Sequence, residues 1–187
     1  MIQAIAPTLT LQEFLQLPET KPASEYIEGR ISQKIMPQGK HSAIQTELAS
    51  LLNAALRSKR IARAFAELRC TFGDRSIVPD ISVFSWDRIL RDENSEIANA
   101  FQIAPDWTIE ILSPDQSQTK VTKNILHCLK YGTQMGWLID PSEQTVFVYE
   151  SKREIQVFDL PETMLPFPDF ANLVQLSLRD LFELLLA

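Results

Sequence analysis

Two acidic residues stand inside segments whose other residues are mostly apolar. Asp80 lies within residues 77–84 and Glu110 within residues 107–112, and both segments are predicted to be strands. Neither segment offers a clean polar face that would simply keep its acid in water. A carboxylate that loses water without gaining a partner is destabilised or takes up a proton. The pair therefore predicts a divalent cation such as Mg²⁺, as at phosphodiester-cleaving sites, although a structural ion pair or an exposed strand end is the alternative.

Two lysines follow Glu110 at a spacing that could add to this site. Lys120 and Lys123 lie one turn apart near the start of a predicted helix over residues 119–131, so they share a face. The positive end of the helix dipole disfavours a cation there unless an anion is close. A protein carboxylate or a substrate phosphate would serve as that anion. The alternative is two solvated lysines on a surface helix.

The other residue types that commonly carry chemistry form no such pattern. His41 and His127 fall on different predicted helices, and the glycines form no phosphate-binding loop. Cys70 and Cys128 fit no metal-ligand spacing, so we expect two reduced, buried thiols in a cytoplasmic protein. No signal peptide and no segment long enough to span a membrane is expected.

The composition indicates a folded globular protein of 187 residues, 45% hydrophobic and 22% charged. Its net charge of −6 disfavours a generic basic nucleic-acid binder. The charge is unevenly spread, however. Residues 57–75 carry six basic side chains against two acidic ones, which is compatible with phosphate contact, while residues 87–100 form an acidic excursion.

The predicted elements make a mixed α/β fold around one sheet, with helices flanking a run of strands. Three helices are predicted besides residues 119–131. The first is capped by Thr10 and Glu13, the second covers residues 41–56, and the last is capped by Ser177 and Asp180. Besides the two acid-bearing segments, strands are predicted at residues 25–27, 31–36, 64–72, 136–140, 145–150 and 154–158.

Several short motifs resemble, in order and spacing, those of one known family. They are Val-Pro-Asp-Ile at 78–81, Glu-Ile-Leu-Ser-Pro at 110–114 and Gly-Trp-Leu-Ile-Asp-Pro at 136–141. The helix at 9–14 and the hairpin at 25–29 add to the likeness, which runs from about residue 9 to residue 150. The sequence is similar to the Uma-two type family of restriction endonucleases, within the PD-(D/E)XK nuclease superfamily.

The resemblance implies a restriction-endonuclease-like core, a central mixed sheet flanked by helices. It implies a single domain over residues 1–187, with a core at 9–150 and a strand and helix extension at 151–187. Asp80 and Glu110, on adjacent central strands, would bind Mg²⁺ or Mn²⁺, and Glu25 would contribute from the hairpin. The implied activity is metal-dependent hydrolysis of DNA by a homodimer.

The position of the catalytic lysine is the point at which this sequence departs from the superfamily pattern. The usual spacing would place it at residue 112, which is Leu112. The family is similar in having its lysine on the following helix, where counting back from Trp137 leads to Asn124 or its neighbour. Lys123 is adjacent and Lys120 lies one turn earlier, so both are candidates.

Two other functions stay open at this point. The displaced lysine favours a catalytically silent binding or scaffold protein that keeps the nuclease fold. A nuclease acting on particular DNA structures in repair, rather than in restriction, is a third interpretation. The chain contains no methyltransferase or translocase region, so it could not form a complete restriction system alone.

Overall fold

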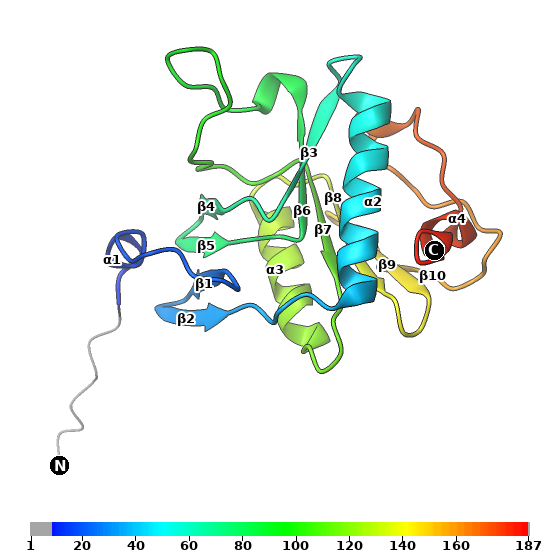
Figure 1. Cartoon of the computed structure of the whole chain (residues 1–187), viewed down its shortest axis with the longest axis horizontal. Coiled ribbons are helices and arrows are strands. Elements are labelled where there is room, and N and C mark those ends of the chain that lie inside the picture. The colour runs from blue at the N-terminus through cyan, green and yellow to red at the C-terminus, as the bar shows by residue number, and fades with distance from the viewer. Residues whose placement is uncertain (1–8, 187) are drawn as a thin grey trace.

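The computed structural model describes residues 9–186 (Figure 1). The helices are α1 (Leu11–Phe14), α2 (Gly39–Leu56), α3 (Gln118–Lys130) and α4 (Leu178–Glu183), with short 3-10 turns η1 (Trp86–Arg88) and η2 (Asp169–Ala171). The strands are β1 (Ser24–Ile27), β2 (Arg30–Gln33), β3 (Ala62–Ala66), β4 (Cys70–Phe72), β5 (Arg75–Ile77), β6 (Ile81–Ser85), β7 (Trp107–Ile111), β8 (Met135–Asp140), β9 (Thr145–Glu150) and β10 (Gln156–Phe158).

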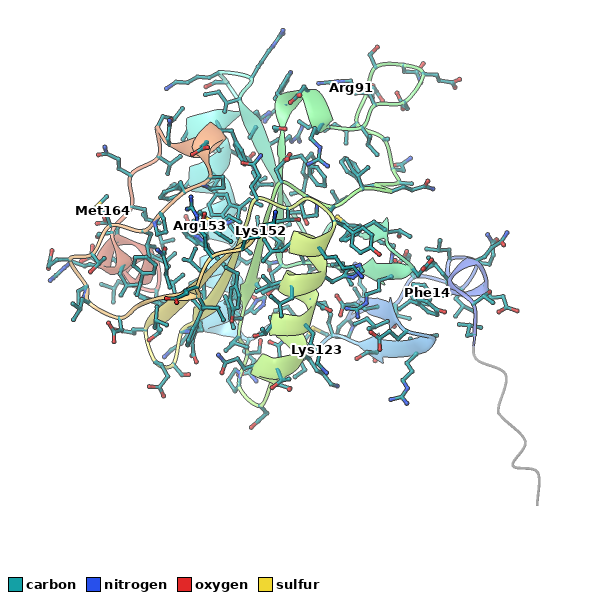
Figure 2. The ribbon with its side chains drawn as sticks, turned by 180° about the vertical axis from the view of Figure 1, so that it is seen from behind. Phe14, Arg91, Lys123, Lys152, Arg153 and Met164 are labelled. Atoms are coloured by element: carbon teal, nitrogen blue, oxygen red, sulfur yellow. The ribbon has the colours of Figure 1, made fainter. Side chains whose placement is uncertain are left out.

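A six-stranded mixed sheet forms the centre of the fold, in the order β10-β9-β8-β7-β6-β3. β7 and β8 are parallel, and α3 is the crossover helix that a parallel pair requires. α2 lies over one face of this sheet and α3 over the opposite face, as the two opposite views show (Figure 1 and Figure 2). The predicted α/β class, a mixed sheet flanked by helices, is confirmed.

A second sheet, which the sequence did not predict, lies beside the first in the order β2-β1-β5-β4 (Figure 1). Two predicted strands are therefore divided between the sheets: residues 64–72 contribute to β3 and β4, and residues 77–84 to β5 and β6. Pro79 lies in the second break, where its missing N–H and fixed φ help to end the pairing of β5. Asp80 is consequently placed at the junction of the two sheets, directly before β6.

The main hydrophobic core lies between α2 and the large sheet. Its largest side chains are Trp107 and Trp137, which are fully buried and pack edge to face with ring centroids 4.8 Å apart. α2 supplies the fully buried Ile44, Leu48, Leu52 and Leu56 to this core. This packing fixes β7, and therefore Glu110, in the middle of the molecule.

The predicted helix caps and buried thiols are also confirmed. Thr10 with Glu13, and Ser177 with Asp180, each form a capping box. Cys70 and Cys128 are free and buried. Among the helices of residues 9–186, none has the length and apolar character needed to cross a membrane.

Gly136 on β8 allows α3 to pack closely against the large sheet. A Cβ added there would lie 2.3 Å from Cγ2 of Ile125, which is fully buried on α3. We expect Gly136→Ala to lower the free energy of unfolding by about 1–3 kcal/mol, because the packed side chain has little room to move. Urea denaturation of both proteins measures this, and an unchanged midpoint would contradict the close packing.

Candidate active site

Asp80 is anchored by groups from three parts of the fold. Its Oδ1 accepts a hydrogen bond from Lys34 Nζ at 2.6 Å, and its Oδ2 accepts one from the backbone N–H of Ile111 on β7 at 2.7 Å. His41 Nε2, in the first turn of α2, lies 3.1 Å from the same Oδ2. Only 1% of Asp80 is exposed. The carboxylate is therefore held in one orientation.

Glu110 comes from β7 and is 3% exposed. Its register partner on β8 is Leu138, which packs against α3, so the acid lies on the α3 face of the sheet. Its Oε2 is 3.8 Å from Lys34 Nζ. Because β6 and β7 are neighbouring strands, the structure brings Glu110 and Asp80 to the same place.

Glu25 reaches the same place from the small sheet. It lies on β1 and is 7% exposed. Its Oε1 accepts a hydrogen bond from the backbone N–H of Val78 at 2.9 Å, and its Oε2 accepts one from Asn124 Nδ2 at 3.3 Å. Three carboxyl groups thus converge from β1, the sheet junction and β7.

Lys34 supplies the positive charge of the cluster, and our sequence reasoning missed it. It follows β2 directly, and its Nζ donates to the carbonyl of Val78 at 2.7 Å as well as to Asp80. A usable signal lies in the predicted hairpin. Glu25 pairs with Ser32, so Lys34, two residues farther on, lies diagonally across on the same face.

The pKa values of the three acids are shifted in different directions. Burial raises the pKa of Glu110 well above its usual value, with Lys34 opposing the shift, and burial likewise raises the pKa of Glu25. Burial acts in the same direction on Asp80, but Lys34 and His41 outweigh it and hold the pKa of Asp80 below its usual value. Burial disfavours the ammonium of Lys34, yet the three acids raise the pKa of Lys34 overall. One ammonium therefore faces three carboxyl groups.

This chain matches the model of one protein family over most of its length. The Uma2 family, described as "Putative restriction endonuclease", matches residues 11–179. The chain belongs to the Uma2 family. The resemblance inferred from the motifs is confirmed.

The chain is also similar to solved structures. One is the crystal structure of "a putative nuclease belonging to DUF820 from Anabaena variabilis ATCC 29413", with 71% identity, a TM-score of 0.94, and coverage of 95% of this chain and 99% of that chain. A cryo-EM structure of a DrdV–DNA complex aligns with 77% of this chain and 11% of that chain, at 14% identity and a TM-score of 0.39. No curated protein matches.

The two lysines that the family resemblance suggested lie away from the ion pairs of this site. Lys120 and Lys123 are exposed on α3, with Lys123 seen on its outer surface (Figure 2). Within residues 9–186, neither forms an ion pair with an acid. The α3 residue that reaches the cluster is Asn124, which is 7% exposed. Asn124, at or beside the position to which the family resemblance assigns a lysine, thus brings a neutral amide to the cluster.

The chemistry of the candidate site fits a hard divalent cation. The cluster has three buried carboxyl groups and one buried ammonium. Asp80 and Glu110 already share one cation, the ammonium of Lys34. In the described part of the chain, no three acidic, histidine or cysteine side chains are arranged to hold one ion together. Mg²⁺ does not require such a set, because one or two protein carboxylates with waters and substrate phosphates complete its coordination.

Proposed function

We propose that this Uma2 protein is a Mg²⁺- or Mn²⁺-dependent endonuclease that hydrolyses phosphodiester bonds in DNA. The observation that carries the proposal is the convergence of Glu25, Asp80 and Glu110 around a single ammonium. Buried acids in excess of their counter-ions either take up protons or gain stability when a cation joins them. The similarity to a solved structure described as "a putative nuclease" supports the same function.

The roles of the acids follow from their positions. Asp80 and Glu110 would hold the metal, which when bound supplies positive charge at the scissile phosphate and lowers the pKa of water. The N–H of Ile111 and His41 Nε2 keep the Asp80 carboxylate oriented. Glu25, fixed by the N–H of Val78 and by Asn124, would bind water at the edge of the pair. Burial of all three acids keeps bulk water away from the charges.

A catalytically silent scaffold is the second candidate, and one observation favours it. Lys34 forms ion pairs with both Asp80 and Glu110, and this internal cation partly replaces a metal. The two functions differ in a measurable way. A silent protein keeps this arrangement when Mn²⁺ is added, whereas the nuclease binds Mn²⁺ and cleaves DNA.

Some features of the proposed nuclease stay predictions. DNA contact by residues 57–75 is one. Two of these basic residues, Arg69 and Arg75, already pair with Glu19 and Glu28, which leaves fewer positive charges for phosphate.

The single domain over residues 1–187 and the homodimer also stay predictions. Light scattering of the purified protein measures whether it is a dimer. A catalytic role for Lys120 or Lys123 also stays a prediction, tested by replacing each with methionine.

Cleavage of supercoiled and linear plasmid DNA tests the proposed function. We expect nicking or linearisation in Mg²⁺ or Mn²⁺ and none in EDTA, because the acids alone do not supply the positive charge needed at the phosphate. An identically purified Asp80→Asn protein controls for contaminating nucleases. Equal activity in the variant, or no cleavage of any DNA by the unaltered protein, would contradict the proposal.

A further inference from the structure

We propose that Lys34 is the catalytic lysine of this site and that it contacts the scissile phosphate directly. This inference rests on the proposed nuclease function and adds a residue on the small sheet to the site. The positive charge would thus come from the end of the β1–β2 hairpin and not from α3.

The contacts of Lys34 place its ammonium beside both acids. Its Nζ lies 2.6 Å from Asp80 Oδ1 and 3.8 Å from Glu110 Oε2, and the carbonyl of Val78 accepts a third contact at 2.7 Å. The side chain of Lys34 is 12% exposed, against 2% for Asp80 and 4% for Glu110. Of these three charged groups, Lys34 therefore has the greatest access to an approaching phosphate.

The contact between α3 and the cluster supplies no positive charge. Asn124 is the residue through which α3 touches the acids, and its Nδ2 donates to Glu25 at 3.3 Å while its Oδ1 is buried without a hydrogen-bond partner. An amide carries no net charge, so it cannot offset the charge that develops on a phosphate during hydrolysis. Of the two side chains that contact the acids from the hairpin and from α3, Lys34 is thus the one that bears a charge.

The proposed role involves no proton transfer by Lys34. During hydrolysis, the oxygen of water bonds to phosphorus as the bond from phosphorus to one sugar oxygen breaks. The water gives up one proton to solvent, and the departing sugar oxygen gains one proton from solvent, so no net proton is taken up in the bond exchange. Lys34 stays protonated and donates a hydrogen bond to a non-bridging phosphate oxygen, where the negative charge increases in the transition state.

Moving the lysine from residue 34 to residue 124 tests this proposal. The proteins to compare are the unaltered chain, the single variant Lys34→Met and the double variant Lys34→Met/Asn124→Lys. Lys130→Met is the control, because Lys130 is exposed on α3, the helix that carries Asn124. We expect Lys34→Met to slow single-turnover cleavage in Mn²⁺ by about 100-fold or more. The double variant should regain at least about tenfold of that loss, because residue 124 contacts Glu25, a member of the same acidic cluster. Lys130→Met should cleave at the unaltered rate.

Mn²⁺ affinity, measured by calorimetry, is a second readout that does not depend on cleavage. Without the competing ammonium, Lys34→Met should bind Mn²⁺ about threefold more tightly or better. If Lys34→Met does not fold, Lys34→Arg is used instead, because arginine keeps a positive charge beside Asp80 and Glu110. A folded Lys34→Arg protein should still lose about tenfold or more in rate, because guanidinium geometry differs from that of an ammonium.

The proposal is overturned if folded Lys34→Met cleaves within about threefold of the unaltered protein, or if Lys34→Arg keeps the full rate. It is also overturned if the double variant regains nothing, if Mn²⁺ affinity does not rise, or if Lys120→Met or Lys123→Met loses the activity instead. These outcomes leave the nuclease function in place. An unaltered protein that cleaves no DNA would remove the nuclease function itself.

Discussion

Replacing Asp80 with asparagine is expected to slow metal-dependent DNA cleavage by at least about 10²- to 10³-fold and to lower the free energy of unfolding by about 3 kcal/mol. The rate falls because a neutral amide binds a divalent cation poorly. The stability falls because the ammonium of Lys34, 2.6 Å from Asp80 Oδ1, keeps its burial but loses its closest anion.

The contribution of Asp80 to stability depends on pH. Lys34 and His41 outweigh burial and lower the pKa of Asp80 in the folded protein, so the folded state binds fewer protons than the unfolded state. The contribution of Asp80 to stability is therefore present above the usual aspartate pKa and is lost as the pH falls through the lowered value. Asp80→Asn should lack this acid-dependent loss.

Asp106→Asn is a matched control for the loss of a buried acid. Asp106 is 3% exposed and forms an ion pair with Arg88, outside the candidate site. This variant should lose stability and keep its cleavage rate per folded molecule. Chemical denaturation and single-turnover cleavage of the same preparations separate the two effects. A similar loss of cleavage in both variants would show that the effect of Asp80→Asn is only structural.

Replacing Glu110 with glutamine should have opposite effects on stability and activity. In the absence of metal at neutral pH, we expect a gain of about 1 kcal/mol in the free energy of unfolding, together with loss of cleavage. Burial raises the pKa of Glu110 well above its usual value, with Lys34 opposing and Asp80 and Glu25 adding to the rise. The ionised carboxylate is thus costly to bury, and glutamine removes that charge.

The sign of the pH effect follows from the raised pKa. The folded protein retains a proton on Glu110 that the unfolded chain loses, so the stabilising contribution is full below the usual glutamate pKa and disappears as the pH rises through the folded value. The advantage of Glu110→Gln should therefore grow with increasing pH. Urea denaturation in EDTA across acidic, neutral and alkaline pH measures this. A variant that is less stable at every pH would contradict an unfavourable buried charge.

Local patterns were sufficient to predict most of the helices and strands. Apolar spacing predicted a helix over residues 41–56, and α2 spans Gly39–Leu56. The residues 119–131 predicted as a helix correspond to α3 at Gln118–Lys130. These predictions succeed because amphipathic periodicity is set by residues only a few positions apart.

The division into two sheets could not be predicted in the same way. Residues 77–84 have the composition of one continuous strand, but the chain leaves the small sheet after Ile77 and enters the large one at Ile81. Which strands pair is decided by contacts far apart in the sequence, and alternation along one segment does not report them. Pro79 was the only local sign of the break.

The sequence predicted the acids of the candidate site, but it did not reveal the lysine that pairs with them. Asp80 and Glu110 were noticeable because a carboxylate in an apolar strand requires an explanation. Lys34 was not, because a lysine near the end of a polar hairpin arm is unremarkable by itself. Only the approach of the hairpin to the sheet junction, 46 residues away in sequence, shows that its ammonium is buried against Asp80.

Crystals of the full chain soaked in Mn²⁺ test the central claim most directly. Anomalous scattering locates Mn²⁺ independently of the protein coordinates. The account predicts a strong anomalous peak in contact with carboxylate oxygens of both Asp80 and Glu110, with the ammonium of Lys34 displaced from between them. A map without a peak at these two acids, in which Lys34 keeps both ion pairs, would contradict a metal-dependent nuclease site.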